Sequence, residues 1–118
     1  NISPKAAIAG SVTLNNDVTI GMGANIHQGL TIGSCSMIGM GAVVINDVPP
    51  FVTVAGVPAK KIKVNKIKLE RLGISRILID HIQEVLLKDS SLKKIKLSSR
   101  DNHYYQILER WVKKGKVS

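Results

Sequence analysis

The sequence predicts a β-solenoid followed by an α-helical C-terminal region. The first observation is a six-residue repeat that runs through residues 2–49 without an insertion. Its leading position is a large aliphatic residue eight times, at Ile2, Ile8, Leu14, Ile20, Ile26, Ile32, Ile38 and Val44. The second is that a small or apolar residue, from Ala6 to Val48, stands four places later in every unit. The third is a composition of 44% hydrophobic but only 3% aromatic residues, which suits a core of Ile, Val and Ala.

A period of six fits neither a helix nor a simple strand. A helix would return apolar residues at intervals of three and four, and a half-buried strand at intervals of two. Six residues accommodate a short strand and a turn, with one aliphatic side chain pointing inward from each unit. Such units bury their apolar faces by stacking on their neighbours, which also supply the backbone hydrogen-bond partners.

The repeat ends at Pro49 and Pro50, because proline lacks the N–H that a strand ladder needs. Residues 51–55 then read as one last strand and residues 56–59 as a turn. The alternation in residues 60–64 predicts a short strand with one wet face. The chain is therefore divided into a repeat region, residues 1–59, and a basic helical region, residues 60–118.

Apolar spacing and end signals predict four helices in the second region. Asn65 and Ser75 have the position of N-caps, and Gly73 that of a helix end. The expected helices are residues 66–72, residues 76–88, a short one around Leu92 and Ile95, and a last one from Asp101 or Asn102 to Gly115, with Trp111 buried.

The charge is concentrated in the second region. The whole chain carries +9, and residues 60–118 hold 16 Lys and Arg against six Asp and Glu, a balance of +10. A basic half of this kind indicates a negatively charged partner. Nucleic acid is one candidate, but only Tyr104, Tyr105 and Trp111 could stack on bases, so we expect no nucleic-acid binding.

The cysteine, the histidines and the lengths of the apolar runs argue against a disulfide-bonded protein, a metalloprotein and a protein with a transmembrane helix. Cys35 is the single cysteine, so no intrachain disulfide can form and a cytoplasmic location is expected. The three histidines, His27, His81 and His103, have no metal-ligand spacing, so we expect no metal and no bound cofactor. We read His81 and His103 as structural and Cys35 as inert. No apolar run approaches the length of a transmembrane helix.

The hexads, with the segments Gly41–Val44, Asp47–Pro50 and Gly56–Lys60, resemble those of the hexapeptide-repeat acyltransferases. This resemblance implies a left-handed parallel β-helix with three hexads per coil. Eight hexads then give fewer than three coils, and we expect the sequence to be the C-terminal part of a longer chain. It also implies a homotrimer with sites between subunits and an acyl donor carried as a thioester on acyl carrier protein or CoA.

A narrower resemblance links Ala9-Gly10, the Ile26-His27-Gln28 segment and the pattern from Val64 to Ser75 to the UDP-N-acetylglucosamine O-acyltransferase family. It implies that the Gly10 amide holds the thioester oxyanion and that His27 and Gln28 contact substrate. Asn65 and Arg71 would contact the nucleotide half of the sugar, where a guanidinium grips phosphate with two donors. The family's general base is a histidine about one coil before Gly10, outside this sequence.

The chain departs from that family's pattern at three positions, with Ser11 in place of a histidine, Ile67 in place of a glutamate and Leu72 in place of a basic residue. Acylation of another nucleotide-linked amino sugar is therefore an alternative to UDP-N-acetylglucosamine acylation in lipid A synthesis. An acetyl-CoA-dependent sugar acetyltransferase, a non-catalytic trimerising scaffold and a basic nucleic-acid-binding module are further alternatives. The basic region would attract acidic acyl carrier protein.

Overall fold

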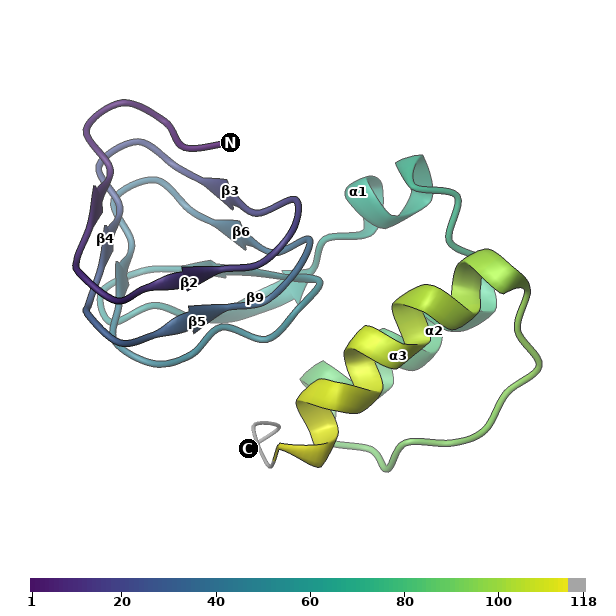
Figure 1. The fold of residues 1–118 in the computed structure, drawn as a ribbon. Helices are drawn as coiled ribbons and strands as arrows, with labels where there is room; N and C mark the ends of the chain where they lie inside the picture. Colours follow the sequence, from purple (N-terminus) through teal and green to yellow (C-terminus); the bar gives the residue numbers. More distant parts are fainter. Residues whose placement is uncertain (115–118) are drawn as a thin grey trace.

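The computed structural model of the chain describes residues 1–114. Its first part is a coil of two-residue strands that recur every six residues. These strands are β1 (Ala7–Ile8), β2 (Thr13–Leu14), β3 (Thr19–Ile20), β4 (Asn25–Ile26), β5 (Thr31–Ile32), β6 (Met37–Ile38) and β7 (Val43–Val44). Figure 1 shows the successive turns of the coil stacked on one another.

The strands β1, β2, β3 and β4 each pair in parallel with the strand three units later. Ile8 lies opposite Ile26, and Ile26 lies opposite Val44, so one turn of the coil takes 18 residues. The stacking builds three sheets, in the orders β1-β4-β7, β2-β5 and β3-β6-β8-β9. The predicted stacking of hexads in parallel sheets, with helices after them, is confirmed.

The interior of the coil is filled by the leading aliphatics. Ile20, Ile32 and Ile38 are fully buried, and Ile26 and Val44 are 2% and 1% exposed. Ile2 and Leu14 depart from the prediction, since they remain 51% and 36% exposed. Both lie in the first turn, which has a stacked turn on one side only in this chain.

The corners of the coil use a left-handed backbone conformation at every sixth residue. The positions with positive φ are Lys5, Ser11, Asp17, Gly23, Gly29, Cys35 and Gly41. Glycine adopts this conformation without strain, which explains Gly23, Gly29 and Gly41. Gly21 has no positive φ and is required for a different reason. A Cβ there would lie 2.7 Å from the backbone N of Met40 in the next turn, so Gly21 permits close stacking.

Two strands close the coil and lead out of it. β8 (Val52–Ala55) pairs in parallel with β6 and antiparallel with β9 (Lys60–Val64). Both strands were predicted, within one residue of these bounds. Because β9 is hydrogen-bonded to β8, the first element after residue 59 is part of the coil's own sheet.

The short helix α1 (Lys66–Arg71) ends as predicted at Gly73, which has a φ of +78°. The Gly73 N–H donates to the Glu70 carbonyl and the Ile74 N–H to the Leu69 carbonyl, which satisfies the last turn of the helix. Asn65 has the N-cap position, but its side chain makes no capping hydrogen bond.

The second helix, α2 (Arg76–Leu87), matches its prediction, and Ser75 caps it by accepting the Leu78 N–H at 3.3 Å. The third, α3 (Ser99–Lys113), begins before the expected Asp101 because Ser98 Oγ accepts the Asp101 N–H at 3.2 Å. Gly115, the predicted helix end, lies outside the described residues.

The short helix expected around Leu92 and Ile95 is wrong, because residues 88–98 form an irregular connection between α2 and α3. His81 Nε2 accepts the Lys93 N–H at 3.3 Å, and Tyr105 Oη donates to the Lys93 carbonyl at 2.9 Å. These two long-range hydrogen bonds use the backbone groups of Lys93 that a helix would need.

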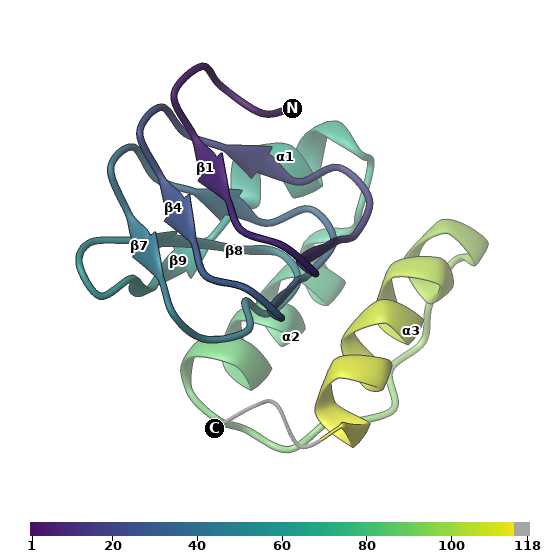
Figure 2. The same ribbon diagram turned by 60° about the vertical axis from the view of Figure 1, so that its left-hand side comes forward.

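The helices pack on one another and on the coil, in one continuous core. Leu78 and Ile82 of α2 and Leu108 of α3 are fully buried, and Trp111 is 8% exposed, as predicted. Asp101 Oδ1 accepts the Ser75 N–H at 3.0 Å and so joins the starts of α2 and α3. Figure 2 shows both helices beside the coil. None of the helices in the described part of the chain is long and apolar enough to cross a membrane.

Candidate functional site

Gly10, His27 and Gln28 lie together at the corner between the β1-β4-β7 sheet and the β2-β5 sheet, which we call the Gly10 corner. The Gly29 N–H donates to the Gly10 carbonyl at 3.2 Å, so these residues are adjacent in successive turns. All three candidate residues are exposed. A Cβ built on Gly10 would meet nothing within 4 Å, and the Gly10 N–H has no hydrogen-bond partner among residues 1–114.

This arrangement leaves a backbone donor open to solvent beside an imidazole and an amide. A backbone N–H at a fixed corner is held in place before a charge develops on a bound group, which is what an oxyanion site requires. Each turn of the coil stacks on the next through backbone hydrogen bonds, such as His27 N–H to the Val44 carbonyl at 3.1 Å. The position of the Gly10 amide is therefore set by the coil itself.

Asn65 and Arg71 lie at a different corner, where the chain passes from the β2-β5 sheet to the β3-β6-β8-β9 sheet. The Asn65 N–H donates to the Phe51 carbonyl at 2.8 Å, and the Phe51 N–H to the Ser34 carbonyl at 2.9 Å. We call this the Asn65 corner. Asn65 is half-buried and Arg71, at the end of α1, is exposed. Figure 1 shows α1 and the β1-β4-β7 sheet on opposite sides of the coil.

The five candidate residues therefore form two groups within one chain. The Gly10 corner holds the donor and the imidazole, and the Asn65 corner holds the amide and the guanidinium.

The lysines of residues 60–63 and 93–96 differ in their contacts and exposure. Lys61 Nζ donates to the Leu86 carbonyl at 2.9 Å, near the end of α2, where a cation also complements the helix dipole. Lys61 thus has a structural role, whereas Lys60, Lys63, Lys94 and Lys96 are exposed. The surface left for an acidic partner is smaller than the sequence count indicates.

His81 has the structural role predicted for it. It is 6% exposed, stacks on Tyr105 with ring centroids 6.1 Å apart, and accepts the Lys93 N–H. Burial lowers the pKa of His81, Lys93 lowers it further, and Glu84 acts in the opposite direction. The neutral form is the one that accepts the hydrogen bond.

Cys35 is buried, with 2% of its surface exposed, at a corner of the coil. Burial raises the pKa of its thiol to about 11, and the Asp17 carboxylate contributes to the increase. The thiol stays protonated at neutral pH and is a poor nucleophile. Residues 1–114 contain no group of three His, Cys, Asp or Glu side chains arranged to hold a metal ion.

A cavity of about 460 Å³ between the coil and α3 was not foreseen from the sequence. It brings Asn15 and Asn16 of the coil near Arg110 of α3 and Lys114, the residue that follows the helix. These residues are far apart in the sequence and share no motif, so no local signal could have paired them. Only the packing of α3 against the coil brings them together.

Comparison with known proteins identifies relatives along the whole chain. A family model described as UDP N-acetylglucosamine O-acyltransferase, domain 2, matches residues 47–96. Acyl-[acyl-carrier-protein]–UDP-N-acetylglucosamine O-acyltransferase of Nautilia profundicola is 36% identical, over 98% of this chain and 47% of its own length.

Solved structures agree with this result. LpxA from Acinetobacter baumannii superposes with a TM-score of 0.72 at 26% identity, over 98% of this chain and 45% of that one. The acetyltransferase domain of PglB from Neisseria gonorrhoeae, in complex with acetyl coenzyme A, matches with a TM-score of 0.51 at 43% identity, over 52% of this chain and 30% of that one. The chain spans less than half the length of each of these relatives. It belongs to the hexapeptide-repeat acyltransferases, and its residues 47–96 match the second domain of the UDP-N-acetylglucosamine O-acyltransferase family.

Proposed function

We propose that this protein takes part in transferring an acyl group from acyl carrier protein to a nucleotide-linked amino sugar such as UDP-N-acetylglucosamine, as in lipid A biosynthesis. The observation that carries the proposal is the Gly10 corner, where an unpaired backbone N–H lies beside exposed His27 and Gln28. The similarity to the acyl-carrier-protein-dependent enzyme of Nautilia profundicola over 98% of the chain supports it.

In this proposal each residue has one task. The Gly10 N–H donates to the thioester carbonyl oxygen as negative charge develops on it during attack by the sugar hydroxyl. His27 and Gln28 hold the acyl donor and the sugar. Asn65 binds the nucleotide and Arg71 its phosphates, with two parallel N–H donors. The general base belongs to the preceding coil of such enzymes, so none of these five residues removes the hydroxyl proton.

The proposed assembly is a homotrimer of left-handed coils, with the site between the Gly10 corner of one subunit and the Asn65 corner of the next. Exposed apolar side chains on the coil support an association between chains. Met22 and Met40 are stacked in successive turns and are 49% and 75% exposed, and Val57 is 72% exposed. Apolar surface gathered in this way usually marks a contact between proteins. The basic region after residue 59 attracts the acidic carrier protein, and the cytoplasm supplies these substrates.

The test has two measurements. Release of thiol from acyl-carrier-protein thioester, dependent on UDP-N-acetylglucosamine, measures the transfer, and calorimetric titration with UDP-N-acetylglucosamine measures binding alone. Arg71→Ala is expected to weaken binding of the nucleotide sugar at least about tenfold, because it removes a charged hydrogen-bonding partner. Arg76→Ala, which removes an exposed arginine of α2, serves as the matched control. Equal affinity for the Arg71 variant and the unmodified protein would remove Arg71 from the proposed site.

An acetyl-CoA-dependent sugar acetyltransferase is the second candidate. The acetyltransferase domain of PglB matches 52% of this chain, and Ser11 stands where the resemblance to the acyl-carrier-protein enzymes implies a histidine. Replacing the carrier-protein thioester with acetyl-CoA in the same assay separates the two donors. Nucleotide-sugar binding without transfer from either donor would instead favour a non-catalytic binding protein.

A further inference from the structure

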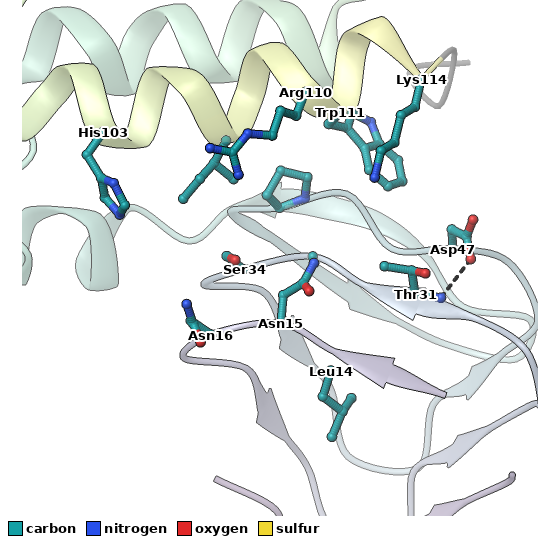
Figure 3. Close-up of a pocket in the computed structure, with 13 residues that line it drawn as sticks. Leu14, Asn15, Asn16, Thr31, Ser34, Asp47, His103, Arg110, Trp111 and Lys114 are labelled. Atoms are coloured by element: carbon teal, nitrogen blue, oxygen red, sulfur yellow. Dashed lines mark hydrogen bonds between the residues drawn. The ribbon is translucent and has the colours of Figure 1, made fainter. Parts of the chain in front are cut away.

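The cavity between the coil and α3 has the features of a second ligand site, beyond the proposed function. Figure 3 shows Arg110 of α3 and Lys114, which follows the helix, on one side and Asn15, Asn16 and Ser34 of the coil on the other. None of the five proposed site residues lines this cavity. Its volume of about 460 Å³ lies in the range of small-molecule sites, roughly 300 to 1,000 Å³.

The charged groups of the cavity are unequally distributed. Within residues 1–114 the ion pair on α3 joins Lys113 and Glu109 at 3.7 Å, and neither Arg110 nor Lys114 forms one. The carboxylate in the lining is Asp47, whose Oδ1 accepts the Thr31 N–H at 2.8 Å. The α3 side therefore presents two cations, and the coil side presents one carboxylate, which accepts a hydrogen bond from the Thr31 N–H.

Apolar surface lines the cavity beside these cations. Trp111 lines the cavity and is 8% exposed, and its Nε1–H is buried without an acceptor among the described residues. Because Nε1 has less than 1 Å² of accessible surface, a ligand in the cavity would contact the Trp111 ring and not its N–H. Ile107 and Pro50 add apolar surface beside this ring.

We infer that this cavity binds a small phosphate ester with an apolar body. Arg110 holds the phosphate with two parallel donors, Lys114 adds a second positive charge, and the side-chain amide of Asn15 donates from the opposite wall. The apolar body lies against Ile107 and the Trp111 ring. Two cations and several donors favour an anion over a neutral or cationic ligand.

Phenyl phosphate tests the inference, because Trp111 is the single tryptophan of the chain and reports binding by its own fluorescence. A saturable change in emission is expected. The double variant Arg110→Gln, Lys114→Gln is expected to bind at least about tenfold more weakly, since it loses both charged partners. Lys113→Gln removes a neighbouring lysine that does not line the cavity and pairs with Glu109, and the affinity of this variant for phenyl phosphate should be unchanged.

Three outcomes would overturn the inference. They are no saturable change with phenyl phosphate, an equal response to neutral benzyl alcohol, and an equal loss in the Lys113→Gln control. If the double variant is unfolded by circular dichroism, Arg110→Gln alone, followed by calorimetry, decides the same question. Arg71→Ala should bind phenyl phosphate normally, so this site and the proposed acyltransferase site can fail separately.

Discussion

Ser11 occupies a backbone conformation that normally belongs to glycine. Its φ is +62°, at the corner position where Gly23, Gly29 and Gly41 stand in later turns. A residue with a Cβ is strained there by roughly 1–2 kcal/mol. The repeat thus contains positions at which single side chains reduce the stability of the coil.

Ser11→Gly is therefore expected to stabilise the protein by about 1 kcal/mol, once the extra freedom of glycine in the unfolded chain is subtracted. Urea unfolding followed by circular dichroism measures the change. Ser3→Gly is the control, because φ at Ser3 is not positive and only the entropic cost remains. A destabilised Ser11→Gly variant would show that the corner tolerates serine without strain.

His81 makes stability depend on pH. Its pKa is lowered in the folded protein, mainly by burial, so between the unfolded value of about 6.5 and the folded value the unfolded chain binds the proton first. This contribution to the free energy of unfolding is complete above pH 6.5 and is lost as the pH falls through the folded pKa.

Denaturant unfolding at a series of pH values checks this sign. His81→Gln keeps an acceptor for the Lys93 N–H but cannot titrate, so its stability should fall less than that of the unmodified protein between pH 7 and pH 5. Identical curves for His81→Gln and the unmodified protein would exclude His81 as the source.

At the scale of elements, the start of α3 depends on one hydroxyl. Ser98→Ala removes the acceptor for the Asp101 N–H and is expected to destabilise the protein by about 1 kcal/mol. Ser99→Ala, one residue inside the helix, changes the same side chain without a capping role and should have almost no effect. Thermal unfolding of the two variants compares them directly, and equal losses would refute the capping role of Ser98.

The elements differ in how well the sequence predicts them. The strands and α2 could be predicted from local periodicity. Ile20 and Ile38 belong to the six-residue repeat of the strands, and Ile82 belongs to the helical spacing of apolar residues in α2. The connection around Lys93 could not be predicted, since its conformation depends on His81 and Tyr105, which belong to other elements. Leu14 was predicted to be buried but is 36% exposed, because burial at this position requires stacked turns on both sides and Leu14 lies in the first turn.

The candidate site shows the same difference. The resemblance could select His27 and Arg71, and the structure adds that they lie at different corners of one chain. The backbone hydrogen bonds between successive turns of the coil show which residues share a corner, and these bonds cannot be read from the sequence. The cavity beside Trp111 had no sequence signal, because α3 and the coil meet only after folding.

At the scale of the whole molecule, the separation of the two corners predicts that the site needs more than one chain. Sedimentation at micromolar concentration should give three times the chain mass of 12.8 kDa. A stable monomer of that mass would contradict the trimer.

Mixed oligomers provide a sharper test of the same idea. His27→Ala and Arg71→Ala chains, each defective in UDP-N-acetylglucosamine binding, should regain part of it after joint refolding. A mixed oligomer contains a site with an intact Gly10 corner from one chain and an intact Asn65 corner from the other. If both residues served a site within one chain, joint refolding would restore nothing.

The antiparallel strand β9 has a consequence for the solubility of such assemblies. A stack of parallel strands can in principle grow at its exposed edge by recruiting further copies, as fibrils do. β9 occupies the edge of β8 with the opposite chain direction, and its Lys60 and Lys63 are exposed. The antiparallel direction and the exposed lysines of β9 thus prevent further copies from adding parallel strands at this edge of the β3-β6-β8-β9 sheet.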